Sequence, residues 1–248
     1  MTLTVEHIAK QYGDHKVLND ISFEVPEGKV YVLVGTNGSG KTTLFNILTG
    51  FIAQDSGRVL LDGKSVDGLK PYRRQRKGLG RTFQDMRLVA GLTVKENVLL
   101  SFPSQRGELW WNTLLPSRKV KAEQQHNKEL ATRILMQCFI NDVADSMAGE
   151  ISYGQQKLLN LACCIAGATP VLLLDEPVAG VNPHYRELLT TVVKALRNEG
   201  RTLMIIEHNT DFIESVADRI LFLNDGRIKA YESYNDFRND SEVLDAYV

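Results

Sequence analysis

Apolar residues in the first part of the chain form short runs that are separated by turn residues. This pattern predicts β-strands at residues 3–8, 21–25, 29–34 and 58–61. Residues 41–49 instead repeat apolar side chains at the spacing of a helix, and Gly50 follows them as a stop signal. We therefore expect an N-terminal region made mainly of strands, with one helix among them.

The pattern changes twice after that region. From about residue 85 to 167 it is mainly helical, with few strand signals. Strands and helices then alternate, at residues 171–174, 183–198, 202–206, 210–217 and 219–223. Runs rich in Leu and Ile without polar alternation are typical of a parallel sheet covered on both faces. The sequence thus predicts one α/β domain over residues 1–248, with a core lobe of about 1–84 and 168–248 and an inserted helical lobe of about 85–167.

Composition narrows the class of protein. Hydrophobic residues make up 43% of the chain and charged residues 24%, as in ordinary globular proteins. The formal net charge of −1 argues against a general nucleic-acid binder, and the basic run at residues 73–77 is interpreted as a solvated face. No signal peptide is expected, and no run of 18 apolar residues occurs, so a partner would have to provide any membrane span. The three cysteines, Cys138, Cys163 and Cys164, show no metal-site spacing. Cys163 and Cys164 lie in an apolar stretch, so these two are expected to be buried, reduced thiols.

A phosphate-binding pattern follows the apolar run at residues 30–34. Residues 35–42 read G-T-N-G-S-G-K-T, which matches G-x-x-x-x-G-K-[ST] between a strand and a helix. Glycines let the backbone N–H groups approach the phosphates closely, and the N-terminus of the next helix adds a positive dipole. Lys41 would bridge the β- and γ-phosphates, and the Thr42 hydroxyl would bind Mg²⁺. The pattern predicts binding of a nucleoside triphosphate.

Two acids end a second apolar run, at residues 171–174. Carboxylates at the end of a buried parallel strand are costly unless a cation compensates them. Asp175 is suited to hold Mg²⁺ through water, which leaves Glu176 to orient or deprotonate the attacking water. A GTPase is disfavoured because its base-specificity pattern N-K-x-D is missing.

Residues 151–156, which read I-S-Y-G-Q-Q, open an apolar helix about 20 residues before the acidic pair. They resemble the L-S-G-G-Q signature of ABC (ATP-binding cassette) ATPases, with Tyr153 in place of the first glycine. Ser152 and the amide of Gly154 would form a second anion site at a helix N-terminus. In that family the site binds the γ-phosphate held by the opposite subunit, so the resemblance implies a head-to-tail dimer around two ATP molecules. It also implies a P-loop NTPase fold with a mostly parallel sheet flanked by helices, an N-terminal antiparallel β subdomain and an inserted α-helical lobe.

The resemblance covers nearly the whole chain and assigns further residues. Tyr12 resembles the aromatic residue that stacks on adenine, Gln84 the glutamine that reaches Mg²⁺ and water, and His208 the γ-phosphate histidine. Asn182 stands where the family usually has an aspartate. The implied catalytic residues are Glu176, His208, Gln84 and Lys41. The implied metal ligands are Thr42, Gln84 and Asp175. The implied nucleotide contacts are Tyr12, Val17, Gly35, Asn37, Gly38, Ser39, Gly40, Lys41, Thr42, Thr43, Ser152, Gly154 and Gln155.

Several segments resemble most the ATPases of branched-chain amino acid importers. They are L-F-N-I-L-T-G at residues 44–50, G-R-T-F-Q at 80–84, G-V-N-P at 180–183, and an insertion after Leu100 with two tryptophans. ATPases for urea import and lipopolysaccharide export are similar in design, so the solute stays open. Trp110 and Trp111 could contact a partner or the membrane surface, or pack on the helical lobe.

The resemblance implies a subunit that serves other chains. One expected partner is a second ATPase subunit, either identical or a close paralogue. The others are permease subunits, which would bind near residues 84–98, and a solute-binding protein. Its expected place is peripheral, on the cytoplasmic side of the inner membrane, with ATP and Mg²⁺ as cofactors. The alternatives are the ATPase of a lipopolysaccharide or lipid exporter and an ABC ATPase that transports nothing. A small-molecule kinase is disfavoured because it should lack the ordered signature and His208.

Overall fold

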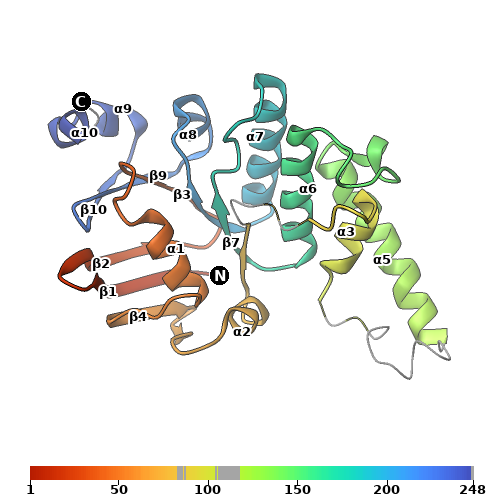
Figure 1. Cartoon of the computed structure of the whole chain (residues 1–248), viewed down its shortest axis with the longest axis horizontal. Helices are drawn as coiled ribbons and strands as arrows, with labels where there is room; N and C mark the ends of the chain where they lie inside the picture. Colours follow the sequence, from red (N-terminus) through yellow and green to blue (C-terminus); the bar gives the residue numbers. More distant parts are fainter. Residues whose placement is uncertain (83–85, 87, 104, 106–117, 247–248) are drawn as a thin grey trace. The chain divides into compact units, whose positions relative to one another are not determined.

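The computed structural model describes residues 1–82, 86, 88–103, 105 and 118–246. The chain divides into two compact units. The first unit spans Met1–Gln84, Thr169–Gly180 and Val193–Val248, and the second spans Asp85–Ala168 and Val181–Val192. Figure 1 labels many of their helices and strands. Residues 181–192, which were expected in the core lobe, group with the second unit.

An antiparallel sheet forms the N-terminal part of the first unit. Strand β1 (Leu3–Tyr12) pairs with β2 (His15–Val25) on one side and with β4 (Ser56–Leu61) on the other, and β5 (Lys64–Ser65) pairs with β4. This sheet confirms the predicted β subdomain. Strands β1 and β2 are longer than expected, because register shifts and positive φ angles at His7 and Asp20 interrupt the alternation of apolar and polar side chains.

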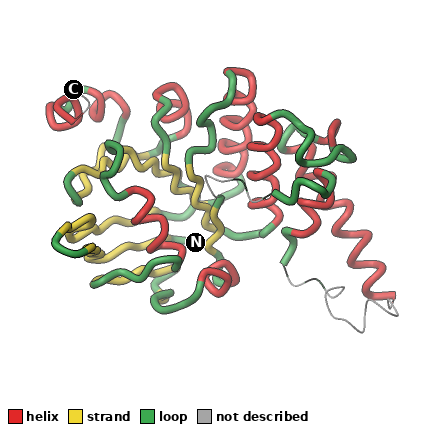
Figure 2. Tube along the Cα trace, in the orientation of Figure 1, coloured by secondary structure: helices red, strands yellow, loops and turns green. Residues whose placement is uncertain are grey.

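A second, six-stranded sheet belongs to the same unit. Its order is β10-β9-β3-β8-β7-β6, and only β10 runs antiparallel to its neighbour. Figure 2 shows these strands in yellow. Every residue of β3, β7 and β8 is buried, as expected for strands covered on both faces. The short β6 and the polar edge strand β10 lacked a sequence signal. The bounds are β3 Val30–Val34, β6 Leu79–Arg81, β7 Val171–Asp175, β8 Thr202–Ile206, β9 Arg219–Asn224 and β10 Arg227–Tyr231.

Helix α1 (Lys41–Thr49) joins the two sheets into one core. Its apolar side chains are fully buried in a cluster that also contains residues of β1, β3, β7 and β8. The helix ends at Gly50, whose φ of 79° gives the left-handed cap that glycine favours. Helix α2 (Pro71–Arg76) contributes Arg74, which donates to the carbonyl oxygens of Ile47 and Leu48 at 2.7 Å each. Arg74 is only 2% exposed, so the interpretation of the basic run as a solvated face is wrong at this residue.

The second unit is helical, as the sequence predicts. It contains α3 (Val94–Leu100), α5 (Arg118–Gln137), a short 3₁₀ helix (Asn141–Val143) and α6 (Tyr153–Ala166). Cys138 is buried, whereas Cys163 and Cys164 are half-buried because they lie toward the less covered side of α6. Cys163 and Cys164 are therefore less buried than the sequence predicts.

The remaining helices follow the parallel strands or close the chain. Their bounds are α7 Pro183–Asn198, α8 Thr210–Val216, α9 Tyr234–Arg238 and α10 Ser241–Ala246. Helix α7 agrees with the expected bounds, and α8 ends one residue earlier than expected. Within the described ranges, no helix combines the length and apolar character that a membrane crossing requires.

Candidate nucleotide site

Strand β3 leads directly into the predicted phosphate-binding loop, residues 35–40, and α1 starts at Lys41. The Nζ atom of Lys41 donates to the carbonyl oxygen of Gly35 at 2.7 Å and to that of Thr36 at 2.8 Å. Lys41 is only 8% exposed, and burial lowers the pKa of its ammonium group. The charges of Glu176 and Asp175 oppose this lowering, so both carboxylates act on the same cation.

The loop is packed closely against the chain that follows β1. Gly40 has a φ of 104°, and a Cβ atom there would lie 2.9 Å from Cγ1 of Val17, so the position excludes a side chain. The Oγ atom of Ser39 is buried and has no hydrogen-bond partner within the described residues. Tyr12, by contrast, is 48% exposed at the end of β1, with Nζ of Lys10 5.4 Å from its ring centroid. The site thus offers a close-fitting polar loop and an accessible aromatic face.

Asp175 is the last residue of β7 and is held by a buried cation. Its Oδ2 atom accepts a hydrogen bond from Arg81 at 2.8 Å, and the two side chains are 5% and 6% exposed. Arg81 also donates to Oδ1 of Asn46 at 2.7 Å and to the Thr49 hydroxyl at 3.2 Å. The backbone N–H of Asp175 donates to Oγ1 of Thr82 at 3.0 Å. These bonds fix the carboxylate at the end of the sheet.

Glu176 follows with strained backbone geometry. Its φ of 47° lies in the left-handed region, which non-glycine residues rarely adopt outside special sites. Its N–H donates to the carbonyl oxygen of Ile206 at 2.9 Å, which ties it to the end of β8. Its Oε1 atom lies 3.7 Å from Nε2 of His208, and both side chains are partly open to solvent. The structure therefore places the predicted base beside the predicted γ-phosphate histidine.

The signature residues belong to the second unit. Ser152 caps α6 in a reciprocal pair with Gln155, whose N–H donates to the serine hydroxyl while its side chain accepts from the serine N–H. The Ser152 hydroxyl donates to the Tyr185 hydroxyl at 3.1 Å. A Cβ atom at Gly154 would lie 2.2 Å from Cδ2 of Tyr185, so the ring covers this glycine. Asn182 accepts from the N–H of Tyr185 at 3.1 Å and so supports the start of α7.

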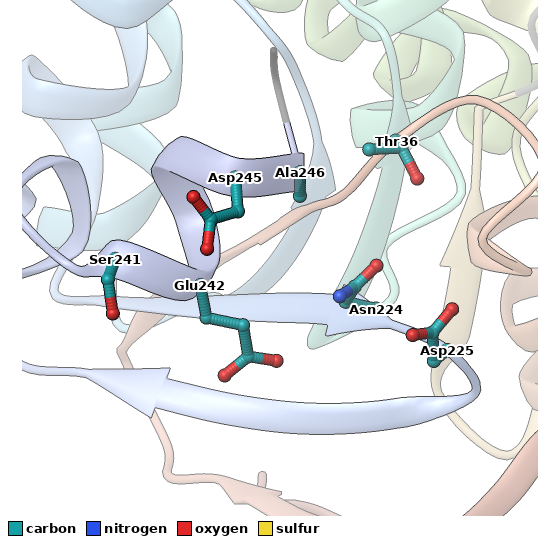
Figure 3. Close-up of a pocket in the computed structure, with 7 residues that line it drawn as sticks. All are labelled: Thr36, Asn224, Asp225, Ser241, Glu242, Asp245 and Ala246. Carbon is teal, nitrogen blue, oxygen red and sulfur yellow. The ribbon is translucent and has the colours of Figure 1, made fainter.

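An open pocket of about 510 Å³ adjoins the first residues of the phosphate loop (Figure 3). Carboxylates of Asp225, Glu242 and Asp245 line it together with Thr36. Figure 3 shows Glu242 and Asp245 on α10, and Asp225 in the turn between β9 and β10. Three carboxylates repel anionic phosphates, so this pocket is not the phosphate-binding site.

The structure therefore gathers most of the predicted residues in the first unit. Thr42 is exposed on the first turn of α1 and Thr43 is half-buried beside it, while Asn37 and Gly38 lie in the loop itself. Three predicted positions lie outside the described residues, namely Gln84, Trp110 and Trp111.

A family model described as ABC transporter matches residues 18–179, which is well over half of the chain. The chain belongs to the ABC transporter family. It is an ATP-binding cassette that binds nucleotide and hydrolyses ATP, with the cassette fold that the signature resemblance implies.

Similar proteins match this ABC ATPase over nearly all of its length. The high-affinity branched-chain amino acid transport ATP-binding protein BraF of Pseudomonas aeruginosa is 32% identical over 247 residues, 99% of this chain and 97% of BraF. The solved ADP conformation of MJ1267, an ATP-binding cassette of an ABC transporter, is 32% identical with a TM-score of 0.86 and covers 100% of this chain and 98% of its own. A dimeric post-hydrolysis structure of the cassette MJ0796, bound to ADP and Pi, shares the fold at 22% identity, with a TM-score of 0.77 over 93% of this chain and 98% of its own.

Three residues of the ABC ATPase contact predicted site residues of their own unit, although the sequence assigns them no role. Arg81 lies in the segment that the resemblance assigns to Gln84, and Glu207 directly precedes His208. Tyr185 lies on α7, more than 30 residues from the signature. A charged residue directly before the predicted γ-phosphate histidine could have identified Glu207, whereas long-range pairs such as those of Arg81 and Tyr185 leave no mark in a single sequence.

Proposed function

We propose that the phosphate loop and Tyr12 bind the ATP of this cassette. Adenine would stack on the exposed ring of Tyr12, next to Val17. Backbone N–H groups of residues 35–40, the N-terminus of α1 and the Ser39 hydroxyl would surround the phosphates, with Asn37, Gly38 and Thr43 in contact. The Lys41 ammonium would exchange the Gly35 and Thr36 carbonyls for β- and γ-phosphate oxygens.

We propose Thr42 and Asp175 as the Mg²⁺ ligands, with Gln84 as a third. The donor set fits the metal, because a hydroxyl and a carboxylate are hard oxygen ligands and Mg²⁺ keeps several waters and phosphate oxygens besides one or two protein ligands. When bound, Mg²⁺ would supply neutralisation of phosphate charge. Arg81 already holds Asp175 in a fixed orientation at the end of β7.

The 3.7 Å separation between Oε1 of Glu176 and Nε2 of His208 carries the proposed mechanism. Glu176 would orient the attacking water and accept its proton at Oε1. His208, 3.7 Å away, would donate from Nε2 toward the γ-phosphate. Gln84 would contact the same water and relay the state of the site to the membrane subunits.

The proposed working unit is a head-to-tail dimer of two cassettes. Ser152, the Gly154 amide and Gln155 would bind the γ-phosphate held by the other subunit, because a capped helix N-terminus attracts anions. Hydrolysis would remove that contact and open the dimer, which couples ATP turnover to a conformational cycle.

We propose that this cycle drives permease subunits that import branched-chain amino acids or a related small solute. The support is the 32% identity with BraF over 99% of this chain and the matching local segments. The cassette would lie peripherally on the cytoplasmic side of the inner membrane, and a solute-binding protein would deliver the solute. The permease would be held near Gln84 and the helical unit.

The Glu176→Gln variant tests the assignment of the base. We expect it to bind ATP normally, to hydrolyse less than about 1% as fast as the wild type, and to accumulate as an ATP-bound dimer in gel filtration. Near-normal hydrolysis would remove Glu176 from this role.

Uptake of radiolabelled leucine by cells that carry this variant tests the solute, since unchanged uptake would exclude branched-chain import by this cassette.

A further inference from the structure

Glu207 is a buried carboxylate that binds only backbone amides in the described contacts. It lies between β8 and His208 and is 2% exposed. Its Oε1 atom accepts from the N–H of Val178 at 3.0 Å, and its Oε2 atom accepts from the N–H of His208 at 2.8 Å and of Asn209 at 3.0 Å. Among the described residues, no cationic side chain forms an ion pair with it.

Burying such a charge is costly, and the three N–H bonds compensate for it. The two oxygens point to different segments. One binds the loop two residues after Glu176, and the other binds the loop that starts at His208. A single rigid group therefore connects the backbones that carry the two catalytic side chains.

The Glu207 carboxylate connects two segments that meet where the backbone of Glu176 is strained. Glu176 has a positive φ and its N–H binds the carbonyl oxygen of Ile206, the residue before Glu207. Strained backbone persists only where the surrounding structure holds it. The Glu207 carboxylate supplies the second link at this junction, so the gap between Glu176 and His208 depends on it.

We propose that Glu207 is a positioning residue that sets the separation between Glu176 and His208. The proposal rests on the proposed function, which assigns the chemistry to those two residues. Because Glu207 is 2% exposed and both of its oxygens accept from backbone amides, it would act through His208 and not by binding the nucleotide. It acts by fixing His208 relative to the base, so it affects turnover and not nucleotide affinity.

The Glu207→Gln variant keeps the shape of the side chain and removes one acceptor. Its NH₂ group must face either Val178 or the pair of amides at His208 and Asn209, so one of the two links is lost. We expect kcat to fall by about tenfold or more while KM for ATP stays within about twofold. Glu214→Gln is the matched control. Glu214 is exposed on α8, seven residues away, and its replacement by Gln removes the same charge. A Glu207→Gln variant with wild-type kcat, or with a changed KM alone, overturns the proposal.

A double variant separates positioning from general loss of structure. If Glu207 acts by placing His208, adding Glu207→Gln to His208→Ala should lower the residual hydrolysis by less than about twofold. If the fold-loss of hydrolysis in the double variant equals the product of the fold-losses in the two single variants, the proposal is overturned. Near-normal hydrolysis by His208→Ala alone contradicts the proposed function, which is a distinguishable result.

Amide hydrogen exchange of the wild-type protein gives an answer even if Glu207→Gln does not fold. The amides of Val178, His208 and Asn209 should exchange as slowly as those in adjacent β8. Exchange at the rate of exposed loop amides overturns the proposal.

Discussion

Arg81 donates to Asp175 at 2.8 Å, and both side chains are almost completely buried. The guanidinium also binds Asn46 and Thr49 of α1 and lies 5.5 Å from the centroid of the Phe45 ring. One cation thereby connects the helix after the phosphate loop to the strand that carries the acidic pair. The bond from Arg81 holds the Asp175 carboxylate at the end of β7.

Replacing Arg81 by Met should destabilise the protein strongly. Removing one partner of a buried ion pair leaves an unpaired charge and costs about 3–5 kcal/mol. We expect the free energy of unfolding in urea to fall by that amount. Arg73→Met is the control, because Arg73 is exposed on α2, and a loss equal to that control would show that the pair contributes nothing.

Tyr12 should determine affinity for the adenine base. Stacking of a base on an aromatic ring is worth about 1–3 kcal/mol, so Tyr12→Ala should weaken ATP binding by roughly tenfold while Tyr12→Trp retains it. Fluorescence titration with a labelled ATP analogue measures this. Tyr72→Ala is the matched control, since Tyr12 and Tyr72 are 48% and 49% exposed. Equal affinity of both alanine variants would refute adenine stacking at Tyr12.

A side chain at Gly154 should disturb the signature through Tyr185. The Cβ atom of Gly154→Ala would lie 2.2 Å from the ring, and overpacking of this kind costs about 1–3 kcal/mol. Thermal unfolding should show this loss, and Tyr185→Ala in the same chain should relieve part of it. Gly91 lies in the same unit, and a Cβ atom there would meet no atom within 4 Å, so Gly91→Ala should not lower the unfolding temperature. Additive losses from Gly154→Ala and Tyr185→Ala would exclude the contact.

Lys41 should make stability depend on alkaline pH. Burial lowers its pKa in the folded protein below the 10.5 of a free lysine, so the unfolded chain binds more protons between the two values. The contribution of Lys41 to stability is therefore least favourable below its folded pKa and improves as pH rises toward 10.5. The free energy of unfolding of the wild type, relative to that of Lys41→Met, should therefore rise as the pH increases toward 10.5. A difference that does not vary with pH would contradict burial of the charge.

The sequence predicts the elements that local chemistry determines. Lys41 and Asp175 lie where the strand–loop–helix pattern and the apolar run place them, since those signals depend on neighbouring residues. The full length of β1 and β2 could not be predicted, because register shifts break the period of two. The partners of Asp175 and Ser152 come from positions 94 and 33 residues away, and only the tertiary fold brings them together.

Hydrolysis measured over a range of protein concentrations tests the central claim that each catalytic site is built from two cassettes. The account predicts that the rate per subunit rises with concentration and levels off as dimers saturate, in parallel with dimer formation measured by light scattering at the same ATP concentration. Rapid hydrolysis by a preparation shown to be monomeric, at a rate per subunit that does not change with concentration, would contradict it.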